Sequence, residues 1–151
     1  MEKISQNQES NNLESQIQKD KEAFADFIKH SDLFSARSLY RKVPELSSHL
    51  EDKEIKNALI HRLQHSIQYS LLGVAEGLKE EFPLSPEVIY ESLKQGLEYP
   101  INQADFSRIK DYVELFDISR EDFISILREI PTERLIHKIP EDELINKIFG
   151  K

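Results

Sequence analysis

The segment LEDKEIKNALIHRLQHSIQYSLLGVAEGLKEEF, residues 50–82, decides the fold. It contains no proline, and apolar residues recur along it at steps of three and four: Ile55, Leu59, Leu63, Ile67, Leu71, Val74, Leu78 and Phe82. Successive residues of an α-helix turn by about 100°, so this spacing places all of them on one face. We therefore predict one long central helix over about residues 52–82, with the rest of the chain packed around it.

Proline and capping residues divide the remaining chain into shorter helices. Pro83 and Pro100 each follow a run with helical apolar spacing, and proline ends a helix because it lacks the amide proton. Ser85 before Pro86, and Ser119 before two acidic residues, are typical helix starts. Strict alternation of apolar and polar residues is absent, which disfavours strands. We expect an all-α fold, either an irregular multi-helix bundle or a helical-hairpin array around the long helix.

The two ends of the chain have distinct compositions. Residues 1–12 are polar, so we expect a flexible tail there and a single all-helical domain over residues 13–151. At the other end, ILREIPTER, LIHKIPEDE and LINKIFGK (126–134, 135–143 and 144–151) align with a nine-residue spacing. Each unit predicts a short helix, the later ones started by proline. Their aliphatic residues favour packing on the protein itself, and clasping a partner is the alternative.

The charge distribution bears on possible partners. The chain has 20 Lys and Arg against 28 Asp and Glu, and residues 79–151 hold ten and sixteen of these. Nucleic-acid binding depends on clustered basic residues, so this acidic balance disfavours such a partner. No apolar run reaches the roughly 18 residues of a membrane span, and the N-terminus lacks a secretory signal. We expect a cytoplasmic protein with no membrane partner.

No arrangement of residues indicates catalysis. His61 and His65 have the spacing with which two imidazoles can share a metal, but HRLQH lacks the glutamate of zinc proteases and no third ligand is near. The chain has no cysteine, no Glu-x-x-His, no glycine cluster for phosphate and no G-x-S-x-G. We therefore expect no enzyme, with no catalytic, metal-binding or cofactor-binding residues and no cofactor.

Two local patterns suggest contacts. Gly73 and Gly77 give a small-x-x-x-small spacing, which predicts close approach of a crossing helix, from this chain or from a second copy. Residues 103–130 resemble a helix-turn-helix, so a DNA-binding transcriptional regulator is an alternative function. The first helix is too long for the usual compact turn. Glu121, Asp122 and Glu129 in the second helix also disfavour that interpretation, since a recognition helix in the major groove is expected to avoid so many acidic residues.

By exclusion, we expect a small protein-binding module: a regulator, adaptor, inhibitor or immunity-type factor. Its partner would be another protein or a second copy of this chain. The candidate contact residues are Tyr69, Tyr90, Tyr99 and Tyr112, because tyrosine is enriched in interface hot spots. The alternative is that these tyrosines cover the edge of the core.

Overall fold

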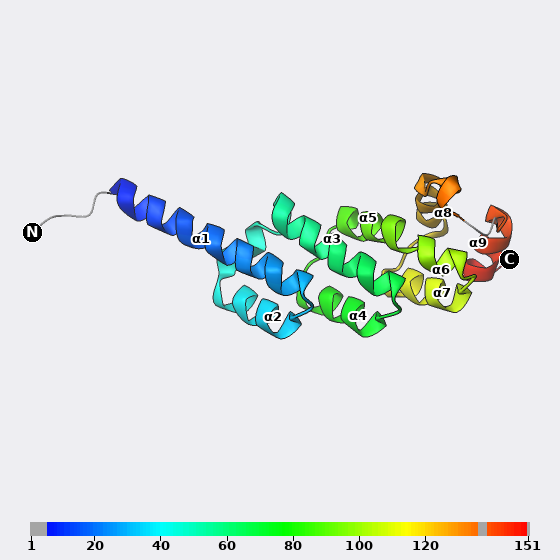
Figure 1. Ribbon diagram of the computed structural model, residues 1–151, viewed down its shortest axis with the longest axis horizontal. Coiled ribbons are helices and arrows are strands. Elements are labelled where there is room, and N and C mark those ends of the chain that lie inside the picture. Colours follow the sequence, from blue (N-terminus) through cyan, green and yellow to red (C-terminus); the bar gives the residue numbers. More distant parts are fainter. Residues whose placement is uncertain (1–5, 136–138, 151) are drawn as a thin grey trace, which may run out of the picture. The chain divides into compact units, whose positions relative to one another are not determined.

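The computed structural model describes residues 6–135 and 139–150. Every regular element in this part of the chain is helical, which confirms the all-α prediction (Figure 1). The elements are α1 (Gln6–Lys29), α2 (Leu33–Lys42), a 3₁₀-helix (Pro44–Ser48), α3 (Lys53–Gln68), α4 (Leu72–Glu81), α5 (Pro86–Gly96), α6 (Glu98–Asn102), α7 (Phe106–Leu115), α8 (Arg120–Glu129), a second 3₁₀-helix (Thr132–Arg134) and α9 (Glu141–Phe149).

The prediction of one continuous helix over residues 52–82 is wrong. The chain turns between α3 and α4 at residues 69–71, and the two helices are separate in Figure 1. Ser70 has a φ of 59°, and the Leu71 amide donates to the Ser66 carbonyl at 2.8 Å, as in a helix end capped by a left-handed residue. The apolar spacing continues across this turn, so periodicity alone could not reveal it.

Contacts divide the chain into two compact units, Met1–Leu59 and Ile60–Lys151, with the boundary inside α3. In the first unit, α2 packs on α1 after a short turn in which Ser31 has a φ of 63°. Asp32 caps α2 by accepting from the Ser35 amide at 3.1 Å. The core residues of this unit are Phe24, Ala25, Ile28, Ala36, Leu46, Leu50, Ile55, Ala58 and Leu59.

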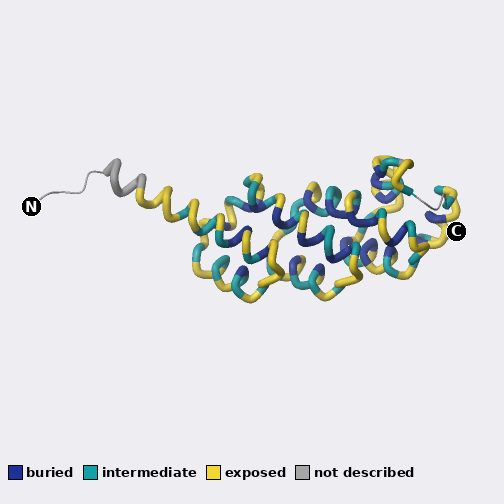
Figure 2. The backbone as a smooth tube through the Cα atoms, viewed as in Figure 1, coloured by how far each residue is buried: buried dark blue, intermediate teal, exposed yellow. Residues whose placement is uncertain are grey.

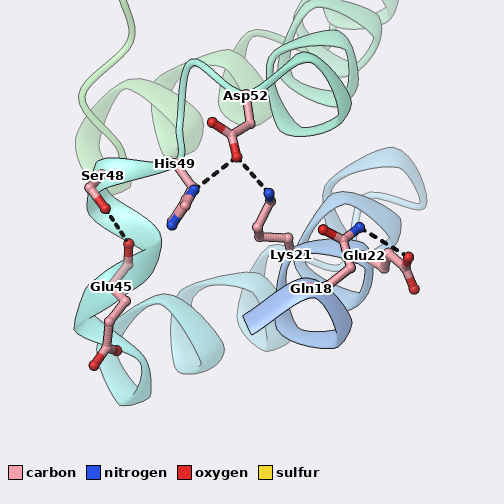
Figure 3. Close-up of polar contacts among 7 residues, drawn as sticks. All are labelled: Gln18, Lys21, Glu22, Glu45, Ser48, His49 and Asp52. Carbon is pink, nitrogen blue, oxygen red and sulfur yellow. Dashed lines mark hydrogen bonds and ion pairs between the residues drawn. The ribbon is translucent and has the colours of Figure 1, made fainter. Parts of the chain in front are cut away.

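A polar cluster ties α1 to the turn that precedes α3 (Figure 3). The Asp52 carboxylate lies 2.6 Å from Lys21 Nζ and 2.8 Å from His49 Nδ1, and one oxygen makes both contacts. These contacts, that of Lys21 first, hold the pKa of Asp52 below its usual value. The cluster joins α1 to the residue before α3, which is a structural role within the first unit.

In the second unit, each helix turns one side inward and the other outward (Figure 2). α4 packs on α7, α5 on α8, and α9 on both α7 and α8. Ser85 and Ser119 accept hydrogen bonds from the amides of Val88 and Asp122, which confirms the predicted starts of α5 and α8. The structure adds α6, a short helix that contains Pro100, where the sequence predicts only a break.

No helix of the described residues crosses closely at Gly73, and a crossing by a second copy stays a prediction. A Cβ placed on Gly73 would meet no atom of the described residues within 4 Å. The close approach is instead at Gly96, the last residue of α5, where a Cβ would lie 2.8 Å from Ile67 Cβ and 2.9 Å from the Gln64 carbonyl oxygen. Only glycine allows α5 to lie this close to α3. Gly77 is half-buried, and a crossing there stays a prediction.

The N-terminal part of the chain is helical where the sequence predicts a flexible tail. α1 begins at Gln6, so residues 6–12, predicted to be part of a flexible tail, are helical. Three of these seven residues, Gln or Glu, favour a helix and the other four, Asn or Ser, do not. Extending a helix that is already nucleated costs less than starting one, which allows α1 to continue through them. The single-domain assignment for residues 13–151 stays a prediction.

The first and third C-terminal repeats bury aliphatic residues within this chain. Ile126 and Ile130 from the first nine-residue repeat are buried, and so are Leu144, Ile145 and Ile148 in α9. This confirms the expected self-packing for the first and third repeats. The second repeat includes residues 136–138, which lie outside the described residues.

Candidate interaction surfaces

The structure separates the four candidate tyrosines into three environments. Tyr69 and Tyr99 are exposed, with 61% and 47% of their surface accessible. Tyr90, on α5, is half-buried beside a surface groove. Tyr112, on α7, is only 1% exposed. The candidates therefore do not form one surface.

The prediction that Tyr112 contacts a partner is wrong. Its hydroxyl donates to the Ser66 carbonyl oxygen at 2.7 Å, which holds α7 against the end of α3. Burial raises the pKa of Tyr112 above its usual value of 10.0. Tyr112 shares a helical face with Ile109, Val113 and Phe116, and that spacing could have placed it in the core.

Tyr69 and Tyr99 lie side by side in a surface cluster with His65 and Arg108, which we call the tyrosine patch. The two tyrosine ring centres are 6.4 Å apart, and the ring centre of His65 lies 4.6 Å from that of Tyr69. The Arg108 guanidinium carbon is 5.8 Å from the centre of the Tyr99 ring, within cation–π distance. The patch joins residues from the end of α3, from α6 and from α7.

Arg108 links the tyrosine patch to the end of α3. Its Nη1 donates to the Gln68 carbonyl at 2.9 Å, which satisfies an acceptor at the end of α3. Its Nε is buried and lies 3.3 Å from Asp105 Oδ2, at ion-pair distance but without hydrogen-bond geometry. Sequence reasoning missed Arg108, whose neighbours are distant in the sequence. It considered His65 only as a possible metal ligand, because the contact with Tyr69 depends on the turn after α3.

His65 packs against an aromatic ring, whereas His61 is exposed. Burial, followed by the positive charges of Arg62 and His61, holds the pKa of His65 below its usual value. A neutral imidazole therefore lies against the Tyr69 ring at neutral pH, tilted by 47° to it. Within the described residues, no group of three or more His, Cys, Asp or Glu side chains is placed to hold a metal ion.

Tyr90 borders a second surface feature, which we call the acidic groove. It has a volume of about 320 Å³ and lies between the start of α5, the turn after α7, and α8. Its lining residues are Leu84, Pro86, Ile89, Tyr90, Phe116, Asp117, Ile118, Asp122 and Ile126. Most of the lining is apolar, and both charged lining residues are acidic.

Helices α7 and α8 occupy the segment that resembles a helix-turn-helix. The exposed positions of α8 carry Glu121, Asp122 and Glu129 beside Arg120 and Arg128. Arg128 is paired with Glu141 at 3.1 Å, so part of this small positive charge is already neutralised. Nothing in this arrangement favours DNA binding, which stays an alternative prediction.

Comparison with known proteins gives no relative: no protein-family model, no curated protein and no solved structure matches this chain. In the part of the chain that the structure describes, no helix combines the length and the apolar character needed to cross a membrane.

Proposed function

We propose that this chain is a protein-binding module without catalytic activity, acting as a small regulator, adaptor, inhibitor or immunity-type factor. The observation that carries the proposal is the tyrosine patch, in which Tyr69 and Tyr99 are exposed and adjacent. Tyrosine and arginine are among the residues that dominate interface hot spots.

The patch is suited to binding because contacts within this chain hold the backbone beneath it. The Arg108 hydrogen bond to Gln68 fixes the base of the patch, and the left-handed Ser70 directs the chain after Tyr69. A tyrosine side chain has few rotatable bonds, so it loses little conformational entropy on binding. An exposed aromatic pair held in this way would lose little conformational entropy when a partner binds.

The test is capture of a partner from the native host with the full chain as bait. We expect Tyr69→Ala/Tyr99→Ala to weaken binding of the captured protein by about 30-fold or more, the effect of losing a hot spot. Phe34→Ala is the matched control, since Phe34 is an aromatic residue of the first unit with 74% of its surface exposed.

A second copy of this chain is one of the partners that the proposal allows. In that case sedimentation velocity of the purified protein shows a dimer that the double tyrosine variant dissociates and Phe34→Ala does not. The proposal is refuted if captured partners and self-association respond equally to the double variant and to the control.

A further inference from the structure

The acidic groove differs from two other hollows of the second unit in its charge. One of them is lined by aliphatic residues with Arg128 and Glu141, and these two form an ion pair. The other mixes Lys110 and Lys147 with acidic residues. The acidic groove has Asp117 and Asp122 and no lysine or arginine among its lining residues.

The lining of the groove combines a buried base with partly accessible sides. Ile126 and Phe116 are buried, whereas Ile89, Ile118 and Tyr90 are half-buried and so remain open to contact. The volume of about 320 Å³ lies near the lower end of the roughly 300–1,000 Å³ typical of ligand clefts. That size suits a few apolar side chains that project from one element.

Both charged residues that line the groove are acidic, and Asp117 also lines the neighbouring hollow that contains Lys110 and Lys147. Asp117 and Asp122 are both exposed. Glu129 lies close enough to Tyr90 to raise the pKa of its hydroxyl, after burial as the larger cause. Lys94, a cation that acts on Tyr90, is shared between Glu91 and Glu129 at 3.5 and 3.6 Å. Lys79 Nζ donates to the Leu115 carbonyl oxygen, one residue before Phe116. An occupant with positive charge beside an apolar face would therefore complement this site.

We propose that the acidic groove binds the apolar face of a basic amphipathic helix from a partner protein. Apolar side chains at helical spacing would contact Ile89, Tyr90 and Ile118, while lysine or arginine residues beside them would face Asp117 and Asp122. The groove is formed by helices and a turn and offers no strand edge, so helix-in-groove binding is the mode that it fits. This site is independent of the tyrosine patch.

The direct test uses the full chain and two labelled peptides. The first is an amphipathic peptide of about 16 residues with leucines on one face and lysines beside them, long enough to form a helix. The second is identical except that glutamates replace the lysines. We expect the lysine peptide to bind with saturation and to bind at least about tenfold more tightly than the glutamate peptide. We also expect its binding to shift the amide NMR signals of residues 84–90 and 116–126.

Variants separate charge from shape. Asp117→Asn/Asp122→Asn keeps the size of both side chains, and asparagine tolerates the positive φ of 51° at residue 117. We expect it to weaken the lysine peptide by about three- to tenfold and to reduce the preference over the glutamate peptide. The control Asp111→Asn/Asp142→Asn makes the same change in net charge at exposed positions outside the groove lining. It should change neither the affinity for the lysine peptide nor the preference over the glutamate peptide.

A third variant tests the apolar part of the site. Ile89→Glu, with its fold checked by circular dichroism, should abolish binding of the lysine peptide. The proposal is overturned if the lysine peptide does not bind, if the shifted amides lie elsewhere, or if both aspartate pairs have the same effect. It is also overturned if the groove proves to be occupied by a second copy, seen as a dimer that Ile89→Glu dissociates.

Discussion

Replacing Gly96 by alanine tests the packing of α5 on α3. An added Cβ would lie 2.8 Å from Ile67 Cβ and 2.9 Å from the Gln64 carbonyl oxygen. Carbon atoms in favourable contact are about 3.5–4.0 Å apart. The nearest atoms are a Cβ and a backbone oxygen, neither of which can rotate away, so the two helices must separate.

The expected cost follows from two opposing terms. Inserting a carbon into a well-packed site typically costs about 1–3 kcal/mol. Alanine in place of glycine recovers up to about 1 kcal/mol of helix propensity, and less at a helix end. We expect Gly96→Ala to lower the free energy of unfolding by about 1–2 kcal/mol, or roughly 2–8 °C in Tm.

Gly73→Ala is the matched control, because it makes the same chemical change in the same unit. No described atom lies within 4 Å of the added Cβ, so only the propensity term remains. We expect this variant to be as stable as the wild type or more stable, by up to about 1 kcal/mol.

Urea denaturation followed by circular dichroism at the helix band measures both variants. The decisive result is the opposite sign of the two changes. If Gly96→Ala is as stable as the wild type, or if Gly73→Ala loses as much stability as Gly96→Ala, the assignment of the helix contact to Gly96 is wrong.

Two further predictions concern buried and paired polar groups. Tyr112→Phe removes the hydroxyl that donates to Ser66, so urea denaturation should show a loss of about 1–1.5 kcal/mol, whereas Tyr99→Phe should change little. The raised pKa of Tyr112 also predicts that wild-type stability falls as the pH rises above 10.0. The fall should be smaller in Tyr112→Phe, which has no hydroxyl to ionise, and an equal fall in both proteins would contradict the assignment. Asp52→Asn should cost at most about 1 kcal/mol at neutral pH, because 35% of the Asp52 side chain is exposed and water screens the pair with Lys21. The lowered pKa of Asp52 means that its contribution is present above the usual value of 3.8 and is lost as the pH falls below it. The stability difference between wild type and variant should therefore shrink in acid, and a difference that persists there would refute the ion-pair assignment.

The sequence by itself determined the features that depend on near neighbours. The helical class follows from apolar spacing, and the starts of α5 and α8 follow from Ser85 and Ser119, whose capping contacts span three residues. The acidic character, and the expectation that it disfavours nucleic acid, follow from composition alone.

Tertiary structure decided what depends on residues far apart in the chain. Ser70 takes a left-handed conformation without being glycine, so the end of α3 has no clear sequence signal. Gly96 meets Ile67 and Gln64, and Tyr112 meets Ser66, only because the helices between them fold back. Periodicity reports which residues share a face. It does not report what that face contacts. The packing of the helices buried Tyr112 against the end of α3 and placed the exposed Tyr69 and Tyr99 side by side.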